Sequence, residues 1–167
     1  YPVEIPGVPN AAFWGMITNI DENMGRLSKK LDALGLTENT ILIFTTDNGT
    51  SSGFKVHNAG MRGNKGSEYD GGHRVPFFVS WPGGGLDGGR DVAELTAHVD
   101  VLPTLIELCD VAAPGGVKFD GVSLVPLLDK ASDASKTWPD RILVTDSQRV
   151  KDPIKWRKSS VMTSRWR

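Results

Sequence analysis

The spacing of hydrophobic positions predicts a helix followed by a strand in the first part of the chain. Apolar side chains recur every three or four residues from 13 to 34, which predicts a long helix with one buried stripe. Gly35 follows where a left-handed helix cap favours glycine. Residues 40–46 (TILIFTT) are apolar or β-branched throughout, which is typical of a strand covered on both faces. A helix leading into a buried strand indicates an α/β fold with packed layers.

Beyond residue 48 the chain alternates between glycine-rich loops and short apolar runs. These runs predict three further strands and two further helices. The strands are expected at residues 75–81, 94–99 and 142–145, and the helices at residues 100–111 and 123–128. Asp100 stands at the expected start of the first of these helices, with Pro103 tolerated in its first turn.

Composition excludes several classes of protein. Hydrophobic residues make up 39% and charged residues 23% of the chain, which is ordinary globular usage. The net charge of −1 gives no reason to expect a nucleic-acid or membrane-surface partner, and no apolar run is long enough for a membrane span. The single cysteine, Cys109, excludes an internal disulfide, and the helical pattern around it predicts a packed thiol.

The first candidate for chemistry is the pair Asp47-Asn48, directly after the first predicted strand. A carboxylate and an amide oxygen side by side suit a hard cation such as calcium or magnesium. The alternative is a plain Asx turn, because Asp-Asn-Gly is ordinary turn chemistry. Two oxygens cannot hold a divalent ion, so a metal site would need further ligands.

The second candidate is the glycine-rich loop that follows. Its glycines allow the backbone to approach a ligand closely, and Lys65, Arg62 and Arg74 offer cations that match a tetrahedral oxyanion. The alternative is a solvated loop whose cations neutralise nearby acids. His57 could line a substrate pocket in the same loop, or it is an ordinary exposed histidine.

Three stretches, in this order, resemble the sulfatase family of the alkaline-phosphatase-like superfamily. Residues 17–27 (ITNIDENMGRL) look like the family's helix before the metal strand, and residues 46–49 (TDNG) look like its metal-ligand motif. Residues 64–76 (NKGSEYDGGHRVP) look like its G-K-G-x-x-Y-E-G-G-x-R-x-P signature, with Asp70 in place of the usual glutamate. Residues 98–105 and 119–124 are also similar to family segments.

The resemblance implies a fold and a domain organisation. It implies part of an alkaline-phosphatase-like layered sheet-and-helix fold, truncated at the N-terminal side. Residues 1–128 would be the C-terminal part of the catalytic domain. Residues 129–167 would be the start of an incomplete C-terminal subdomain. Three tryptophans in that segment could form a carbohydrate-stacking surface, pack within the subdomain, or be left without packing partners by the truncation: Trp138, Trp156 and Trp166.

The resemblance also implies site residues and a cofactor. Asp47 and Asn48 would be calcium ligands, and Lys65 would contact the sulfate ester. Arg62 and His57 are expected to bind substrate because of their chemistry and place in the loop, not because of the resemblance. Family members use a formylglycine nucleophile made within a C/S-x-P-x-R motif, which does not occur in this sequence. We therefore expect a fragment of a sulfuric ester hydrolase that is inactive alone, with the formylglycine in a missing N-terminal part.

The substrate expected from the resemblance is a sulfated small molecule or glycan. The alternatives are a phosphodiesterase or phosphonate monoester hydrolase of the same superfamily, and a non-catalytic binding module. An unpaired sheet edge would favour self-association. Members of this family are usually periplasmic or secreted, or lysosomal in eukaryotes, and the resemblance implies the same location for this protein.

Overall fold

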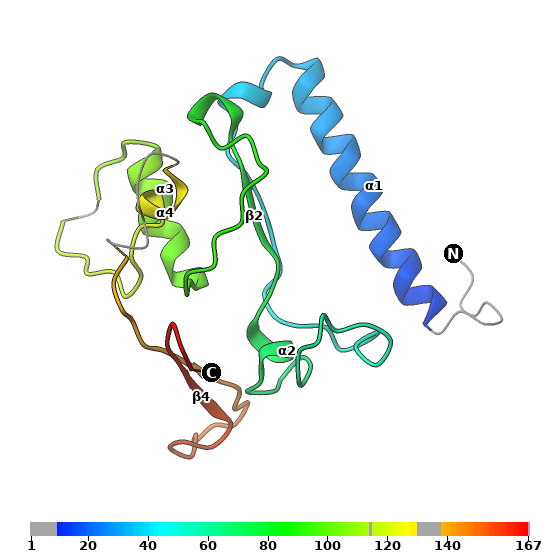
Figure 1. The fold of residues 1–167 in the computed structure, drawn as a ribbon, viewed down its shortest axis with the longest axis vertical. Coiled ribbons are helices and arrows are strands. Elements are labelled where there is room, and N and C mark those ends of the chain that lie inside the picture. Colours follow the sequence, from blue (N-terminus) through cyan, green and yellow to red (C-terminus); the bar gives the residue numbers. More distant parts are fainter. Residues whose placement is uncertain (1–9, 114, 130–137, 167) are drawn as a thin grey trace. The chain divides into compact units, whose positions relative to one another are not determined.

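The computed structural model describes residues 10–113, 115–129 and 138–166, and they form a mixed α/β chain (Figure 1). The chain divides into two compact units. We call the described part of residues 10–88 with 145–160 the hairpin unit, because it contains a long β-hairpin. We call the described part of residues 89–144 with 161–166 the helical unit.

The predicted first helix is confirmed as α1 (Ala11–Ala33). It ends as expected, since Gly35 has a φ of 65° and the Leu36 N–H donates to the Leu31 carbonyl at 3.0 Å. The prediction of a buried stripe is wrong for the described residues. Only Ala11 and Gly15 are buried in the helix, and Met16 is 61% exposed. A stripe is buried only where another element packs on it, and spacing alone does not supply that element.

Two of the predicted strands form an antiparallel hairpin. They are β1 (Leu42–Thr45) and β2 (Phe77–Ser80), paired from Leu42 opposite Ser80 to Thr45 opposite Phe77. The prediction that β1 is covered on both faces is wrong here, because its residues are half-buried or exposed. Phe44 and Phe78 lie opposite each other with ring centroids 6.3 Å apart, yet Phe78 is 64% exposed. Thr37–Asn39 (η1) and Pro82–Gly84 (η2) form short 3-10 turns at the far end of this hairpin.

The helical unit is organised around a buried aspartate. Its elements are η3 (His98–Asp100), α3 (Val101–Leu108) and α4 (Val125–Leu128). The strand predicted at residues 94–99 is wrong, because this backbone is irregular and ends in the 3-10 turn η3. The Asp100 carboxylate, which is fully buried, accepts hydrogen bonds from the Ala97 and Val122 N–H groups at 2.7 and 2.9 Å.

Helix α3 is shorter than predicted, and this changes the environment of the cysteine. The helix ends at Leu108, and Cys109 follows it with an exposed side chain. The prediction of a packed thiol is therefore wrong. Leucines from α4 and the neighbouring loops are the buried side chains instead, together with a methionine of β4: Leu95, Leu124, Leu127 and Met162.

The last two strands, β3 (Leu143–Asp146) and β4 (Ser159–Met162), form a second two-stranded sheet. β3 lies one residue from its predicted position, whereas β4 was not predicted. Trp156 and Trp166 are 71% and 67% exposed, so they do not pack within the described residues. Trp138 is half-buried, with the Arg141 guanidinium 5.9 Å from its ring centroid.

No helix in the described part of the chain is long and apolar enough to cross a lipid bilayer.

The domain boundary between residues 128 and 129 stays a prediction.

The β1–β2 sheet leads to a first testable prediction, because within the described residues each of its strands has one edge without a partner strand. Such an edge presents N–H and C=O groups that can pair with another copy. We expect the purified chain to self-associate, with an average mass by light scattering that rises with concentration. A monomer at all concentrations, with a cooperative melt above about 65 °C, would contradict this.

Candidate functional site

The candidate site is built on the loop that joins β1 to β2, residues 46–76. Because Thr45 pairs with Phe77, the two ends of this loop are held together by the hairpin. Two backbone hydrogen bonds then fold the loop onto itself. The Gly49 N–H donates to the Gly72 carbonyl at 3.0 Å, and the Lys65 N–H donates to the Thr50 carbonyl at 2.9 Å. The segment after Asp47 therefore lies against both halves of the glycine-rich signature.

Glycine is required where these backbone segments meet. A Cβ atom on Gly49 would lie 1.8 Å from the Gly71 carbonyl oxygen, and one on Gly71 would lie 2.3 Å from the Gly63 carbonyl oxygen. A Cβ atom on Gly72 would lie 2.1 Å from the Ser67 carbonyl oxygen. These contacts are with backbone, which cannot rotate away as a flexible side chain can. We call Gly49, Gly63, Gly71 and Gly72 the glycine junction.

Side chains stabilise the loop around the glycine junction. The Asn58 side-chain amide donates to the Met61 and Gly63 carbonyl oxygens at 2.7 and 2.9 Å. The first residues of the chain's long helix also reach the loop, since a Cβ on Gly53 would lie 2.5 Å from the Phe13 ring. These contacts give the loop a shape of its own although few apolar side chains lie within it.

The end of the loop forms a short helix, α2 (Asp70–His73), that the sequence patterns did not predict. The Arg74 guanidinium lies 3.9 Å from the Asp70 carboxylate, an ion pair within the loop. The His73 ring lies 3.2 Å from the Glu68 carbonyl oxygen. His73 thus has a structural contact within the signature.

Asp47 and Asn48 follow β1 after one intervening residue, Thr46, with Asp47 exposed and Asn48 half-buried. An Asx turn at Asp47 would need the Gly49 N–H as the donor to the Asp47 carboxylate. That N–H donates to Gly72 instead, and the Thr46 hydroxyl donates to the Asn48 carbonyl at 3.2 Å. This geometry speaks against an Asx turn at Asp47.

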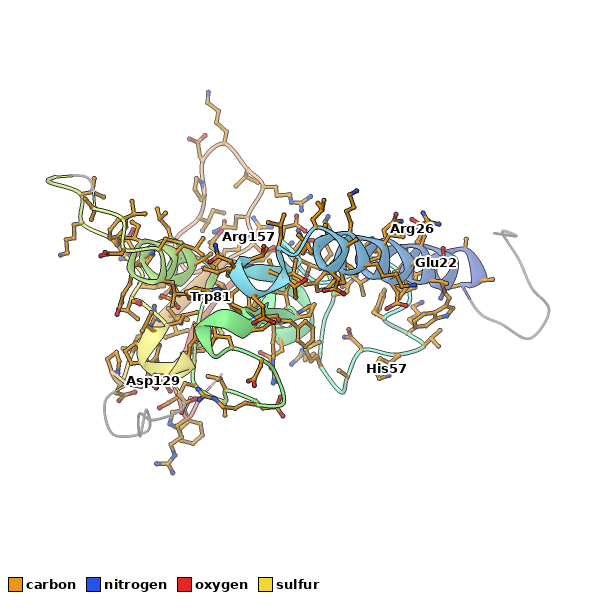
Figure 2. All side chains as sticks on the ribbon, turned by 90° about the horizontal axis from the view of Figure 1, so that it is seen from above. Glu22, Arg26, His57, Trp81, Asp129 and Arg157 are labelled. Carbon is orange, nitrogen blue, oxygen red and sulfur yellow. The ribbon has the colours of Figure 1, made fainter. Side chains whose placement is uncertain are left out.

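Lys65 is exposed, and its backbone is tied to Thr50, three residues after Asp47. Arg62 is exposed as well, but its guanidinium lies 3.7 Å from the centroid of the Tyr69 ring, a cation–π contact. His57 is an exposed loop residue (Figure 2). The structure thus brings the backbones of the metal motif and the lysine together. The substrate contacts of Lys65, Arg62 and His57 stay predictions.

The oxygen donors at this site are of the chemical type that calcium binds. Asp47 supplies a carboxylate and Asn48 an amide oxygen, both hard ligands. No group of three or more His, Cys, Asp or Glu side chains suited to a metal occurs among the described residues. The described chain therefore offers part of a ligand set, against the roughly six to eight oxygens that calcium prefers.

The described residues form a mixed α/β fold with two oxygen donors near the end of a strand and a lysine backbone tied to the same loop. Comparison with known proteins identifies the family. The sulfatase family model matches residues 9–111, and the model of the N-sulphoglucosamine sulphohydrolase C-terminal region matches residues 64–159. The chain belongs to the sulfatase family.

Curated relatives agree with this assignment. The chain is 38% identical over 127 residues to steryl-sulfatase of Mus musculus, an alignment that covers 71% of this chain and 20% of the relative. It is 37% identical over 134 residues to an arylsulfatase of Clostridium perfringens, covering 79% and 26%. The chain thus spans about a quarter or less of the length of these relatives.

Among solved structures, Ps i-CgsB in complex with k-i-k-neocarrahexaose is similar in fold. The TM-score is 0.74, with 24% sequence identity over 86% of this chain and 32% of that chain. At this identity the similarity shows the fold alone. The mixed α/β arrangement of the described residues is thus one that part of a larger solved structure adopts.

Proposed function

We propose that this chain contributes the Asp47-Asn48 calcium ligands and the sulfate-contacting Lys65 of a sulfuric ester hydrolase. The observation that carries the proposal is the hydrogen bond from the Lys65 N–H to the Thr50 carbonyl, together with the bond from Gly49 to Gly72. These bonds hold the metal motif and the lysine loop against each other. Family membership supports the reaction class.

Each residue has a distinct task in this proposal. The Asp47 carboxylate and the Asn48 amide oxygen would hold a calcium ion, which would supply positive charge to the site. The Lys65 ammonium offsets negative charge on the sulfate group and the leaving oxygen, worth about 3 kcal/mol by analogy with other electrostatic stabilisers. Arg62 and His57 line the substrate side of the loop. The nucleophile, a formylglycine, comes from outside these residues.

The proposal extends to the fold and the substrate class. The hairpin unit would occupy one part of a layered sheet-and-helix fold, where α1 and the free edges of β1 and β2 gain partners. The substrate would be a sulfated glycan or a smaller sulfate ester, which is supported by the oligosaccharide complex of Ps i-CgsB. A periplasmic, secreted or lysosomal location belongs to the same proposal.

The test uses binding as well as turnover. We expect the chain to bind the aryl ester 4-nitrocatechol sulfate weakly in the presence of calcium, followed by amide chemical shifts of the Asp47–Lys65 segment. Calcium alone is expected to bind with a Kd of about a millimolar, because few oxygens are supplied. Lys65→Ala is expected to weaken aryl sulfate binding about tenfold, as loss of a charge-assisted hydrogen bond does. No turnover is expected.

Lys55→Ala is the matched control, because Lys55 is an exposed lysine of the same loop outside the signature. It should leave aryl sulfate binding unchanged. If both variants lost the same amount of aryl sulfate affinity, Lys65 would contribute only non-specific positive charge, which would contradict the proposal. Turnover well above background that Lys65→Ala abolishes would contradict the expectation that the chain is inactive alone. Tighter binding of 4-nitrophenyl phosphate would favour the phosphoester alternative.

A further inference from the structure

The loop between β3 and β4 concentrates positive charge. Within residues 149–158, which are all exposed, five residues are Lys or Arg and one is acidic, Asp152. The five cations are Arg149, Lys151, Lys155, Arg157 and Lys158. The whole chain has a net charge of −1, so a segment of +4 leaves −5 for the remainder. Positive charge is thus gathered in this segment, which we call the basic loop; Figure 2 labels Arg157 within it.

The basic loop is held in one shape by a glutamine at its base. The Gln148 side chain donates to the Ile154 carbonyl and accepts from the Ile154 N–H, both at 2.9 Å. Asp146 in turn accepts from the Gln148 side chain at 2.8 Å and from its N–H at 2.9 Å. These two bonds lower the pKa of Asp146, so the carboxylate stays ionised and keeps them at neutral pH. A loop fixed in advance loses less entropy when it binds a ligand.

An aromatic surface lies within the same loop. Trp156 is 71% exposed and has a φ of 67°, a left-handed conformation that non-glycine residues adopt only where the surrounding turn enforces it. The Lys155 ammonium lies 4.9 Å from the centroid of its ring. An exposed indole with a cation beside it offers two kinds of contact at one place. The ring suits an apolar face, and the ammonium suits an anion.

A sulfated sugar presents both of these groups, since its ring has a C–H face and its substituents carry negative charge. A nucleic acid duplex fits less well, because the remainder of the chain is acidic and repels a long, uniformly charged polyanion. The basic loop also belongs to the same compact unit as the loop of Asp47 and Lys65. We propose that the basic loop is a second contact surface for a sulfated oligosaccharide, which binds it through sulfates on the cations and a sugar ring on Trp156. This inference rests on the proposed function, which supplies the substrate class.

The experiment compares two ligands on the full chain by calorimetry at low ionic strength. The ligands are a sulfated hexasaccharide prepared from carrageenan and the small ester 4-nitrocatechol sulfate. The triple variant K155Q/R157Q/K158Q is expected to bind the hexasaccharide about tenfold more weakly, since each exposed charge contributes a small, salt-screened amount. Trp156→Ala is expected to weaken it about fivefold. Both variants should bind the small ester as the unmodified chain does.

Controls separate this inference from general charge effects. The triple variant R26Q/K29Q/K30Q on α1 removes the same charge from another exposed surface and should leave hexasaccharide binding unchanged. An equal loss in that variant, or no loss in the basic-loop variants, would overturn the inference. Equally tight binding of a DNA duplex, or of the desulfated hexasaccharide, would overturn it as well.

The outcome also separates the inference from the proposed function. If Lys65→Ala fails to affect the small ester while the basic-loop variants weaken the hexasaccharide, the proposed function fails and the basic loop stands as a sulfated-glycan surface. If Lys65→Ala weakens the small ester and the basic-loop variants change nothing, the proposed function stands and this inference fails.

Discussion

Replacing Asp100 by alanine is expected to destabilise the helical unit by about 3–5 kcal/mol, a large share of the roughly 5–15 kcal/mol by which domains are typically stable. Asp100 is fully buried, and its carboxylate accepts the Arg141 guanidinium at 2.8 Å as well as two backbone N–H groups. The Arg141 side chain is only 12% exposed. Alanine would leave a buried cation and two N–H donors without their acceptor, and each unsatisfied group costs free energy. Urea denaturation followed by circular dichroism measures the loss.

Two further variants identify the cause of that loss. Asp120→Ala removes an exposed carboxylate of the same unit and should change the free energy of unfolding by about 0.5 kcal/mol or less. Arg141→Leu in the Asp100→Ala background should cost less than in the unmodified chain, because the two groups interact directly. If the two losses simply add, or if Asp100→Ala melts like Asp120→Ala, the buried ion pair is not what holds this unit together.

The Asp100 contacts also show where pattern reading fails. Residues 94–99 (ELTAHV) contain spaced apolar side chains that favour a strand, but the Ala97 N–H donates to the Asp100 carboxylate and the Asp100 N–H donates to the Ala97 carbonyl. This local pair closes a turn, and a side-chain acceptor of this kind competes with sheet pairing. By contrast, the bounds of α1 and β1 were predicted to within two residues, because helical periodicity and a β-branched run are local properties.

Burial was predicted less well than secondary structure, for a physical reason. The apolar stripe on α1 and the apolar run in β1 indicate which side chains each segment can bury. Whether those side chains are buried depends on which other segments pack against them. Met16 and Phe78 remain exposed for that reason. Cys109 was misplaced by the same reasoning, since α3 ends one residue before it.

The sequence indicates which residues are candidates for the site, but it does not predict how their segments are arranged. The motifs around Asp47 and Lys65 follow from the resemblance, and glycine enrichment indicated close backbone approach. No pattern in the sequence shows that Gly49 lies against Gly72, or that the Lys65 N–H reaches Thr50. These are contacts between segments distant in sequence, and composition does not determine them.

Gly49→Ala is therefore expected to have a large effect on the site although the change is one methyl group. The new Cβ would lie 1.8 Å from the Gly71 oxygen and 2.8 Å from its carbonyl carbon, so the two backbone segments must move apart. Such overpacking costs about 1–3 kcal/mol. It would also break the Gly49–Gly72 hydrogen bond that holds the metal motif against the signature. We expect fast amide exchange at Gly49 and Lys65, and about a tenfold loss of 4-nitrocatechol sulfate binding, as for Lys65→Ala.

Gly60→Ala is the control that distinguishes the effect of a backbone clash, expected in Gly49→Ala, from the effect of backbone strain. Gly60 lies in the same loop with a φ of +73°, but a Cβ there would meet nothing within 4 Å. The substitution should cost about 1 kcal/mol through its left-handed backbone and leave both amide exchange at Lys65 and ligand binding as they were. Gly49→Ala has the opposite character, with no left-handed φ and an immediate backbone clash. Slow exchange at Lys65 and intact binding in Gly49→Ala would mean that the glycine junction does not position the lysine, and the link between the two motifs would have to be abandoned.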